Sequence, residues 1–87
     1  MTTLPKESGV AAGRSFRVYG AADLGTAVRQ FRLQAGLSQA RLAQMCGIHR
    51  SYLSDLEGGK VTEQLGRLVE ILGVLGVEIN LQHRPGS

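Results

Sequence analysis

The stretch Gln39-Ala-Arg-Leu-Ala-Gln-Met-Cys-Gly-Ile-His-Arg-Ser-Tyr-Leu-Ser-Asp-Leu-Glu-Gly58 predicts two short helices joined by a tight turn. Ser38 precedes the first helix, at the position where a hydroxyl accepts the unpaired N–H groups of a first turn. Gly47 follows it, where a chain leaving a helix often adopts positive φ. The residues expected in the core, at helical spacing and at the turn, are Leu42, Ala43, Cys46, Ile48, Leu53 and Leu56.

Polar side chains remain on the outer face of the second predicted helix, which spans about 49–56. They lie mostly toward its N-terminal end and are not needed for packing: His49, Arg50, Ser51, Ser54 and Asp55. A helix that presents such hydrogen-bonding groups fits the major groove of B-DNA, where each base pair displays a distinct donor and acceptor pattern. This is the helix-turn-helix plan, in which the second helix enters the groove and the first crosses the backbone.

The stretch closely resembles the Xre/Cro-like helix-turn-helix family, in its core positions, in its Leu37-Ser38-Gln39 entry and in its Leu56-Glu57-Gly58-Gly59-Lys60 exit. The resemblance implies an all-α, lambda-repressor-like bundle of four to five helices. It also implies that Arg32 and Glu57 form a structural ion pair that ties the first helix of the bundle to the end of the recognition helix.

The bulk composition is that of one small domain. The chain has 87 residues and a net charge of +3, which weakly favours a polyanionic partner. Its one cysteine excludes an intrachain disulfide, and no Cys/His cluster has zinc spacing. A domain this small is marginally stable alone, so we expect a homodimer. With no signal peptide and no 18-residue apolar span, we expect a cytoplasmic, nucleoid-associated protein without membrane contact or cofactor.

The N-terminal half is expected to contain a flexible tail over residues 1–14, a short strand over 16–19 and a helix over 21–35. Gly20 serves as the expected N-cap of this helix. Its apolar stripe consists of Leu24, Val28, Phe31 and Ala35. Gly25 inside the helix is expected to be a mild weakness, of about 1 kcal/mol against Ala.

After the motif, Thr62 is the expected N-cap of a further helix that reaches about Val74. Its apolar stripe is wider than one face requires, so we expect part of it to pack within the subunit and part of it to be a candidate interface. Residues 77–82 then alternate strictly, with Val77, Ile79 and Leu81 on one face, as in a half-buried strand. This strand either pairs with residues 16–19 or pairs with its own copy across a twofold axis, and the two arrangements can coexist. Residues 83–87 are expected to be a polar end to the domain of 15–82.

The order of a short strand, a helix-turn-helix bundle and a C-terminal strand resembles the HipB-type antitoxins. That resemblance implies a dimer whose C-terminal strands pair, with Val77, Ile79 and Leu81 at the interface. It further implies a repressor that binds a palindromic operator in double-stranded DNA and holds a HipA-type kinase toxin.

Exposure and resemblance together select Arg50, Ser51 and Ser54 as base readers, with His49 and Asp55 as second choices. His49 is open to a phosphate role, and Asp55 either accepts from cytosine or orients Arg50. The residues expected to contact DNA phosphates are Ser38, Gln39, Arg41, Tyr52 and Lys60.

Enzyme functions are disfavoured because the sequence has no Gly-rich phosphate loop, paired carboxylates or nucleophile beside a base. Cys46 is expected to be a small buried hydrophobe. The competing hypotheses are a stand-alone repressor without a toxin, a protein-interaction module that has lost DNA binding, and a dimerisation domain from a larger regulator.

Overall fold

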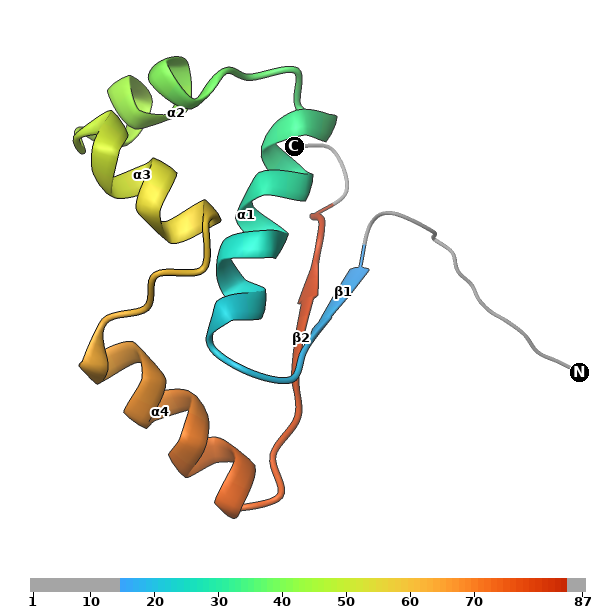
Figure 1. Ribbon diagram of the computed structural model, residues 1–87. Coiled ribbons are helices and arrows are strands. Elements are labelled where there is room, and N and C mark those ends of the chain that lie inside the picture. The colour runs from blue at the N-terminus through green and yellow to red at the C-terminus, as the bar shows by residue number, and fades with distance from the viewer. Residues whose placement is uncertain (1–14, 85–87) are drawn as a thin grey trace, which may run out of the picture.

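The computed structural model describes residues 15–84, so the expectations for segments 1–14 and 85–87 lie outside the described residues. Figure 1 shows α1 in the middle, α2 and α3 on one side of it, and a two-stranded sheet on the other. The order along the chain is β1 (Ser15–Val18), α1 (Ala22–Gln34), α2 (Gln39–Cys46), α3 (Arg50–Glu57), α4 (Glu63–Val74) and β2 (Ile79–Gln82). The described residues are therefore mostly helical, with a small sheet.

Local hydrogen bonds fix where the helices begin and end. The Ser38 hydroxyl accepts the Arg41 N–H at 3.0 Å and the Thr62 hydroxyl accepts the Leu65 N–H at 3.2 Å, so α2 and α4 carry the caps that the sequence predicts. Gly47 ends α2 with φ 70°. The start of α1 differs from expectation, because its N-cap is Ala21 rather than Gly20.

The Asp23 carboxylate explains this difference at the start of α1. Its Oδ2 accepts the N–H groups of Tyr19 at 2.7 Å and Gly20 at 3.0 Å, and the Gly20 carbonyl accepts the Asp23 N–H at 3.0 Å. The aspartate thus secures the turn from β1 into α1 from inside the helix, and no capping side chain is needed at residue 20.

The two strands pair within the chain, antiparallel, with Ser15 opposite Gln82 and Val18 opposite Ile79. This is one of the two arrangements that the sequence left open. The C-terminal strand begins at Ile79 rather than at Val77, because the Val77 N–H donates to the Leu72 carbonyl at 2.9 Å to close α4. The facing strand also ends at Val18, so residue 77 has no partner in this sheet.

The buried core of the described residues is small, with Val18, Ala27, Ala43 and Leu53 each at most 5% exposed. The stripe predicted for α1 left out Ala27, which is the most buried of these. The expectation that Cys46 is buried is wrong, since its side chain is exposed. As the last residue of α2, Cys46 stands where the chain turns away at Gly47, so no neighbouring helix covers it.

Gly25 brings α1 and α3 together at backbone distance. A Cβ built on Gly25 would lie 1.8 Å from the Leu56 carbonyl oxygen, far inside any possible contact. The expectation that this glycine is merely a weak helix former is therefore incomplete. Only a residue without a side chain allows α1 to cross the C-terminal end of α3 so closely.

Candidate nucleic-acid interface

A buried ion pair holds α3 against α1. Arg32 Nε donates to Glu57 Oε2 at 2.7 Å, and Arg32 Nη2 donates to Glu57 Oε1 at 2.9 Å. Their side chains are 8% and 3% exposed. Arg32 Nη1 also donates to the Leu37 carbonyl at 2.8 Å, and Gln39 Nε2 donates to Glu57 Oε1 at 3.0 Å. Four hydrogen-bonding groups, from α1, the α1–α2 turn, α2 and α3, thus meet at one point.

The two charges reinforce each other. The hydrogen bond to Glu57 raises the pKa of the Arg32 guanidinium above its ordinary value. The hydrogen bond from Arg32, followed by that from Gln39, lowers the pKa of the Glu57 carboxyl, while burial works in the opposite direction. Both groups are therefore charged near neutral pH, and the pair fixes the end of α3 to the rest of the bundle.

The outer face of α3 presents polar side chains to solvent. Arg50 is the first residue of the helix, and His49 precedes it as the N-cap in an extended conformation without a side-chain cap. The residues proposed from the sequence as base readers are all exposed: His49, Arg50, Ser51, Ser54 and Asp55. They share one short helix whose far end is fixed by Glu57, which is the arrangement that a groove-reading helix requires.

Asp55 has a neighbour that the sequence did not indicate. Its Oδ1 lies 3.6 Å from the Lys60 Nζ, and both side chains are more than half exposed. Within the described residues, no hydrogen bond or ion pair joins Asp55 to Arg50, so the structure gives no support to the role of orienting Arg50. Because the contact with Lys60 is long and solvated, it leaves both side chains free to meet another partner.

The residues proposed as phosphate contacts lie at the start of α2, in the first turn of α3 and just after the end of α3. The Ser38 hydroxyl caps α2, and the exposed Arg41 donates to Gln44 at 2.9 Å. Tyr52 is 52% exposed and lines a hollow of about 200 Å³ with Lys60. Gln39 differs, because its side-chain nitrogen is already used on Glu57. We therefore assign Gln39 a structural contact in addition to the role that the sequence suggested.

The three residues proposed as a dimer interface differ in their exposure and in their position relative to β2. Val77 is 49% exposed and lies outside the strand. Ile79 and Leu81 are half-buried, and Leu81 lines a hollow together with Phe31 of α1. Leu81 thus packs within its own chain. Val74 of α4 and its C-cap Leu75 are more exposed than Val77, at 84% and 68%.

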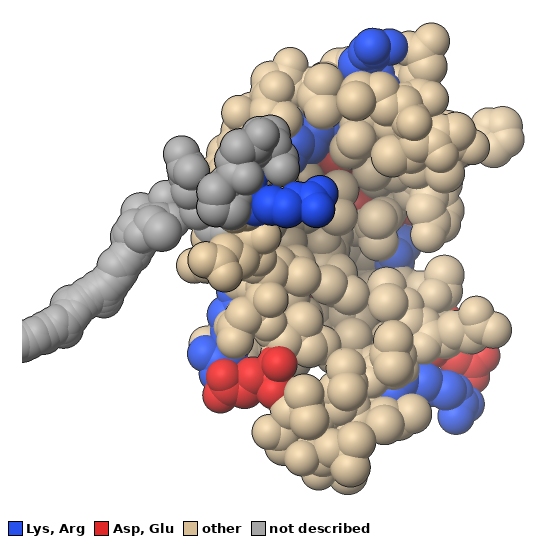
Figure 2. Space-filling view, turned by 180° about the vertical axis from the view of Figure 1, so that it is seen from behind, with Lys and Arg blue, Asp and Glu red and all other residues tan. Residues whose placement is uncertain are grey.

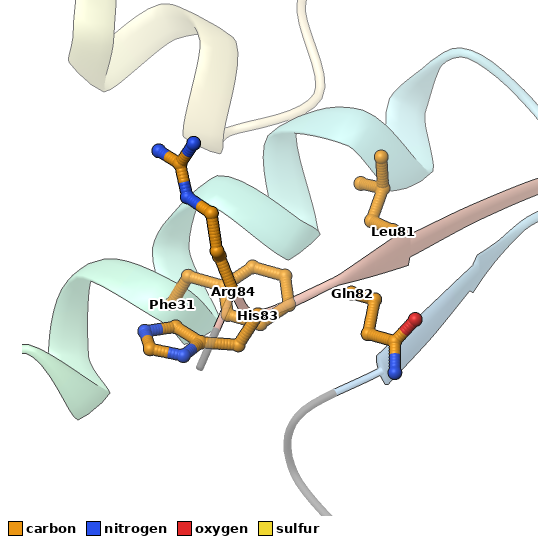
Figure 3. A pocket seen from close by; sticks show the side chains of 5 residues that line it. All are labelled: Phe31, Leu81, Gln82, His83 and Arg84. Atoms are coloured by element: carbon orange, nitrogen blue, oxygen red, sulfur yellow. The ribbon is translucent and has the colours of Figure 1, made fainter. Parts of the chain in front are cut away.

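His83 joins the packing although the sequence placed it in a polar end. Its ring stacks on that of Phe31, with centroids 6.2 Å apart and planes inclined by 29° (Figure 3). Both rings line an open hollow of about 590 Å³, together with Leu81, Gln82 and Arg84. No local pattern predicts this contact, because it depends on the sheet bringing residue 83 back across α1.

Charge alone does not mark a nucleic-acid surface. Figure 2 shows the face opposite to that of Figure 1, where basic and acidic groups are scattered among uncharged residues. In residues 15–84, no helix is long and apolar enough to cross a bilayer. The same residues contain no cluster of His, Cys, Asp or Glu side chains suited to a metal ion. The candidate site therefore rests on the geometry of α2 and α3.

Comparison with known families agrees with this geometry. A family model described as a helix-turn-helix domain matches residues 23–82. A relative from Sinorhizobium fredii, described as an uncharacterized HTH-type transcriptional regulator, y4mF, is 37% identical over 65 residues, covering 75% of this chain and 86% of the relative.

Two further relatives carry functional names. The control protein C.BamHI of Bacillus amyloliquefaciens is 42% identical over 55 residues, covering 62% of this chain and 68% of its own length. The immunity repressor protein of Bacillus phage phi105 is 30% identical over 57 residues, covering 66% of this chain and 40% of its own length. No solved structure matches the chain.

Proposed function

The chain belongs to the helix-turn-helix domain family, and from this premise we propose that it is a sequence-specific DNA-binding repressor of transcription. The observation that carries the proposal is α3 itself. The Arg32–Glu57 pair and the close approach at Gly25 fix one end of this helix, while its polar N-terminal half faces solvent. A rigidly held, exposed polar helix is suited to reading base edges.

Base reading is proposed for Arg50, Ser51 and Ser54. A guanidinium at the first position of α3 can donate two hydrogen bonds to guanine O6 and N7, which is worth about 1–3 kcal/mol of discrimination. The two serines lie three residues apart on the same exposed face and can donate to or accept from either base type. His49 and Asp55 flank this group as secondary contacts.

Phosphate contacts are proposed for the start of α2, for Tyr52 in α3 and for Lys60 just after it. The N-terminus of α2 offers unpaired N–H groups and a partial positive charge, with Ser38 and Gln39 beside it. Arg41, Tyr52 and Lys60 add exposed donors. Such contacts orient the protein on the duplex without reading its sequence, so their loss weakens binding to all DNA equally.

Two finer features of the proposal concern partners. The protein acts as a homodimer on a palindromic operator, since a twofold pair of subunits would present two copies of α3 to two half-sites about one DNA turn apart. As a narrower hypothesis, it is the antitoxin of a HipA/HipB-type pair and binds a kinase toxin. The order of β1, the helix-turn-helix and β2 supports this hypothesis. Co-expression with a HipA-type kinase, followed by size-exclusion chromatography, tests it.

Fluorescence anisotropy over a salt series tests the DNA proposal. The probes are DNA from directly upstream of the gene and the same DNA scrambled, with wild type beside Arg50→Ala. We expect wild type to prefer the upstream DNA, and Arg50→Ala to lose about tenfold to a hundredfold of that preference. The matched control is Arg17→Ala, since Arg17 lies in β1, on the opposite side of α1 from α3 (Figure 1).

Equal, weak and strongly salt-dependent binding to both DNAs, unchanged by Arg50→Ala, would refute the proposal. That result would favour a protein-interaction module built on the same fold.

A further inference from the structure

An apolar hollow lies where the end of β2 returns to the C-terminal half of α1 (Figure 1). It has a volume of about 350 Å³, and residues of α1, the α1–α2 turn, α2 and β2 line it. We call it the α1 hollow. Most of its lining is apolar and includes Val28, Phe31, Leu37, Leu42 and Leu81. Its volume is within the range of small-molecule pockets, about 300–1,000 Å³.

The end of the α1 hollow near His83 is polar. Phe31, Leu81 and His83 also line the adjoining hollow of about 590 Å³, to which Gln82 and Arg84 contribute. Figure 3 shows Leu81 pointing toward α1 and the rings of Phe31 and His83 lying together. No acidic side chain is among the described residues that line the two hollows, whereas two arginines are. An apolar floor beside basic and polar groups suits a ligand with an apolar body and a negative charge.

His83 is a hydrogen-bonding group that the fold does not use. Its ring is held by stacking on Phe31, with centroids 6.2 Å apart. Its Nδ1 is enclosed without a partner, and its Nε2 makes no hydrogen bond with any of residues 15–84. Because Nδ1 is the enclosed nitrogen of this half-buried ring, Nε2 is the nitrogen that a ligand can reach. An imidazole N–H donates readily to a carboxylate oxygen.

We propose that the α1 hollow binds a small carboxylic acid with an aromatic or branched apolar body. The body packs against Phe31, Leu42 and Leu81, and the carboxylate accepts a hydrogen bond from His83 Nε2 within the field of the Arg84 guanidinium. The other arginine of the lining, Arg32, is not the partner of the carboxylate, since its charge is already paired with Glu57.

The size of the α1 hollow favours a small molecule over a docked helix. A volume of about 350 Å³ corresponds to a space about 7 Å on a side, whereas a helix with its side chains is about 10–12 Å across. The positive lining adds a preference for an anion over a neutral apolar compound.

The ligand would contact the part of the chain that positions α3. Arg32 and Leu37 both line the α1 hollow, and Arg32 donates to the Leu37 carbonyl while it holds Glu57 at the end of α3. A ligand that joins α1, α2 and β2 stabilises this arrangement, so we expect it to strengthen DNA binding. This effector role rests on the proposed function, whereas the binding site itself does not.

An NMR titration of the whole chain with 3-phenylpropionate tests the site. Two matched probes are 3-phenylpropionamide, which keeps the body without the charge, and acetate, which keeps the charge without the body. We expect 3-phenylpropionate to bind with a dissociation constant on the order of 1 mM. The largest amide shifts should occur at Phe31, Leu81 and His83. The amide should bind at least about fivefold more weakly, and acetate should give no saturable shift.

Two variants locate the ligand. Ala35 is exposed and lines the α1 hollow, so the longer side chain of Ala35→Leu should fill it and weaken binding at least about tenfold. The matched control is Ala40→Leu, because Ala40 is also exposed but lies in α2 outside the hollow. His83→Phe keeps a ring that can stack on Phe31 and removes both nitrogens. We expect this variant to bind the acid and the amide equally.

Three results would overturn the site. The first is a set of shifts that rise without saturation, and the second is equal binding of the acid by wild type and Ala35→Leu. The third is a change in the Phe31 and Leu81 signals with protein concentration alone, which would mean that a second copy covers the hollow. Equal binding of the acid and the amide by wild type would overturn the carboxylic acid as the ligand class.

Fluorescence anisotropy with upstream DNA separates the site from the proposed function. At constant ionic strength, we expect saturating 3-phenylpropionate to raise the DNA affinity of wild type at least about threefold over acetate, and to leave that of Ala35→Leu unchanged. Saturable binding without this gain would overturn the effector role alone. Saturable binding by a chain that does not prefer upstream DNA would overturn the proposed function alone. Specific DNA binding without saturable ligand binding would overturn the site alone.

Discussion

Replacing Gly25 by alanine should destabilise the protein although alanine is the better helix former. The new Cβ would lie 1.8 Å from the Leu56 carbonyl oxygen. Ordinary contact requires α1 and α3 to separate by roughly 1.5 Å. Because the obstacle is backbone and cannot rotate away, we take the upper end of overpacking costs, about 3 kcal/mol. The gain in helix propensity offsets about 1 kcal/mol. The expected net loss of unfolding free energy is thus about 2 kcal/mol.

Gly66→Ala in α4 is the matched control for this experiment. The nearest atom to a Cβ at Gly66 is Val61 Cγ1 at 3.9 Å, an ordinary contact, so the same substitution should stabilise by about 0.5–1 kcal/mol. In thermal unfolding at one fixed protein concentration, we expect the midpoint to fall by about 10 °C for Gly25→Ala and to rise by a few degrees for Gly66→Ala. A Gly25→Ala protein as stable as wild type would refute the reasoning from close approach.

Three further predictions concern the ends and the exit of the helix-turn-helix. Because Arg32 lowers the pKa of Glu57 below its ordinary 4.5, the pair contributes stability above that pH and loses it as pH falls through the lower folded value. The free energy of unfolding, measured with urea from pH 7 to pH 2, should therefore fall less steeply for Glu57→Gln than for wild type. Parallel plots of this free energy against pH for the two proteins would contradict this. Ser38→Ala should cost about 1 kcal/mol in urea unfolding through loss of the α2 cap, and an unchanged midpoint would contradict it. Lys60→Ala should change stability by less than about 0.5 kcal/mol, since its contact with Asp55 is solvated. In anisotropy it should reduce the slope of log affinity against log salt by about 0.9, and an unchanged slope would remove Lys60 from the phosphate contacts.

The sequence by itself was enough to locate the helices. Capping and helical periodicity act over three or four residues, so Ser38, Thr62 and Gly47 marked real boundaries. The polar face of α3 could be predicted for the same reason, because the residues left outside a helical stripe follow from its period. The ion pair of Arg32 and Glu57, which lie 25 residues apart, came from family resemblance and not from any local pattern.

Only the tertiary structure decided how the elements meet. No local signal shows that Gly25 touches the backbone of Leu56, that Cys46 is left exposed, or that His83 stacks on Phe31. Strand periodicity predicted β2 but not its partner, since the alternation is the same whether the facing strand comes from the same chain or from a copy. The width of the apolar stripe on α4 was visible in the sequence, but which of its sides faces solvent depends on contacts between segments far apart in the chain.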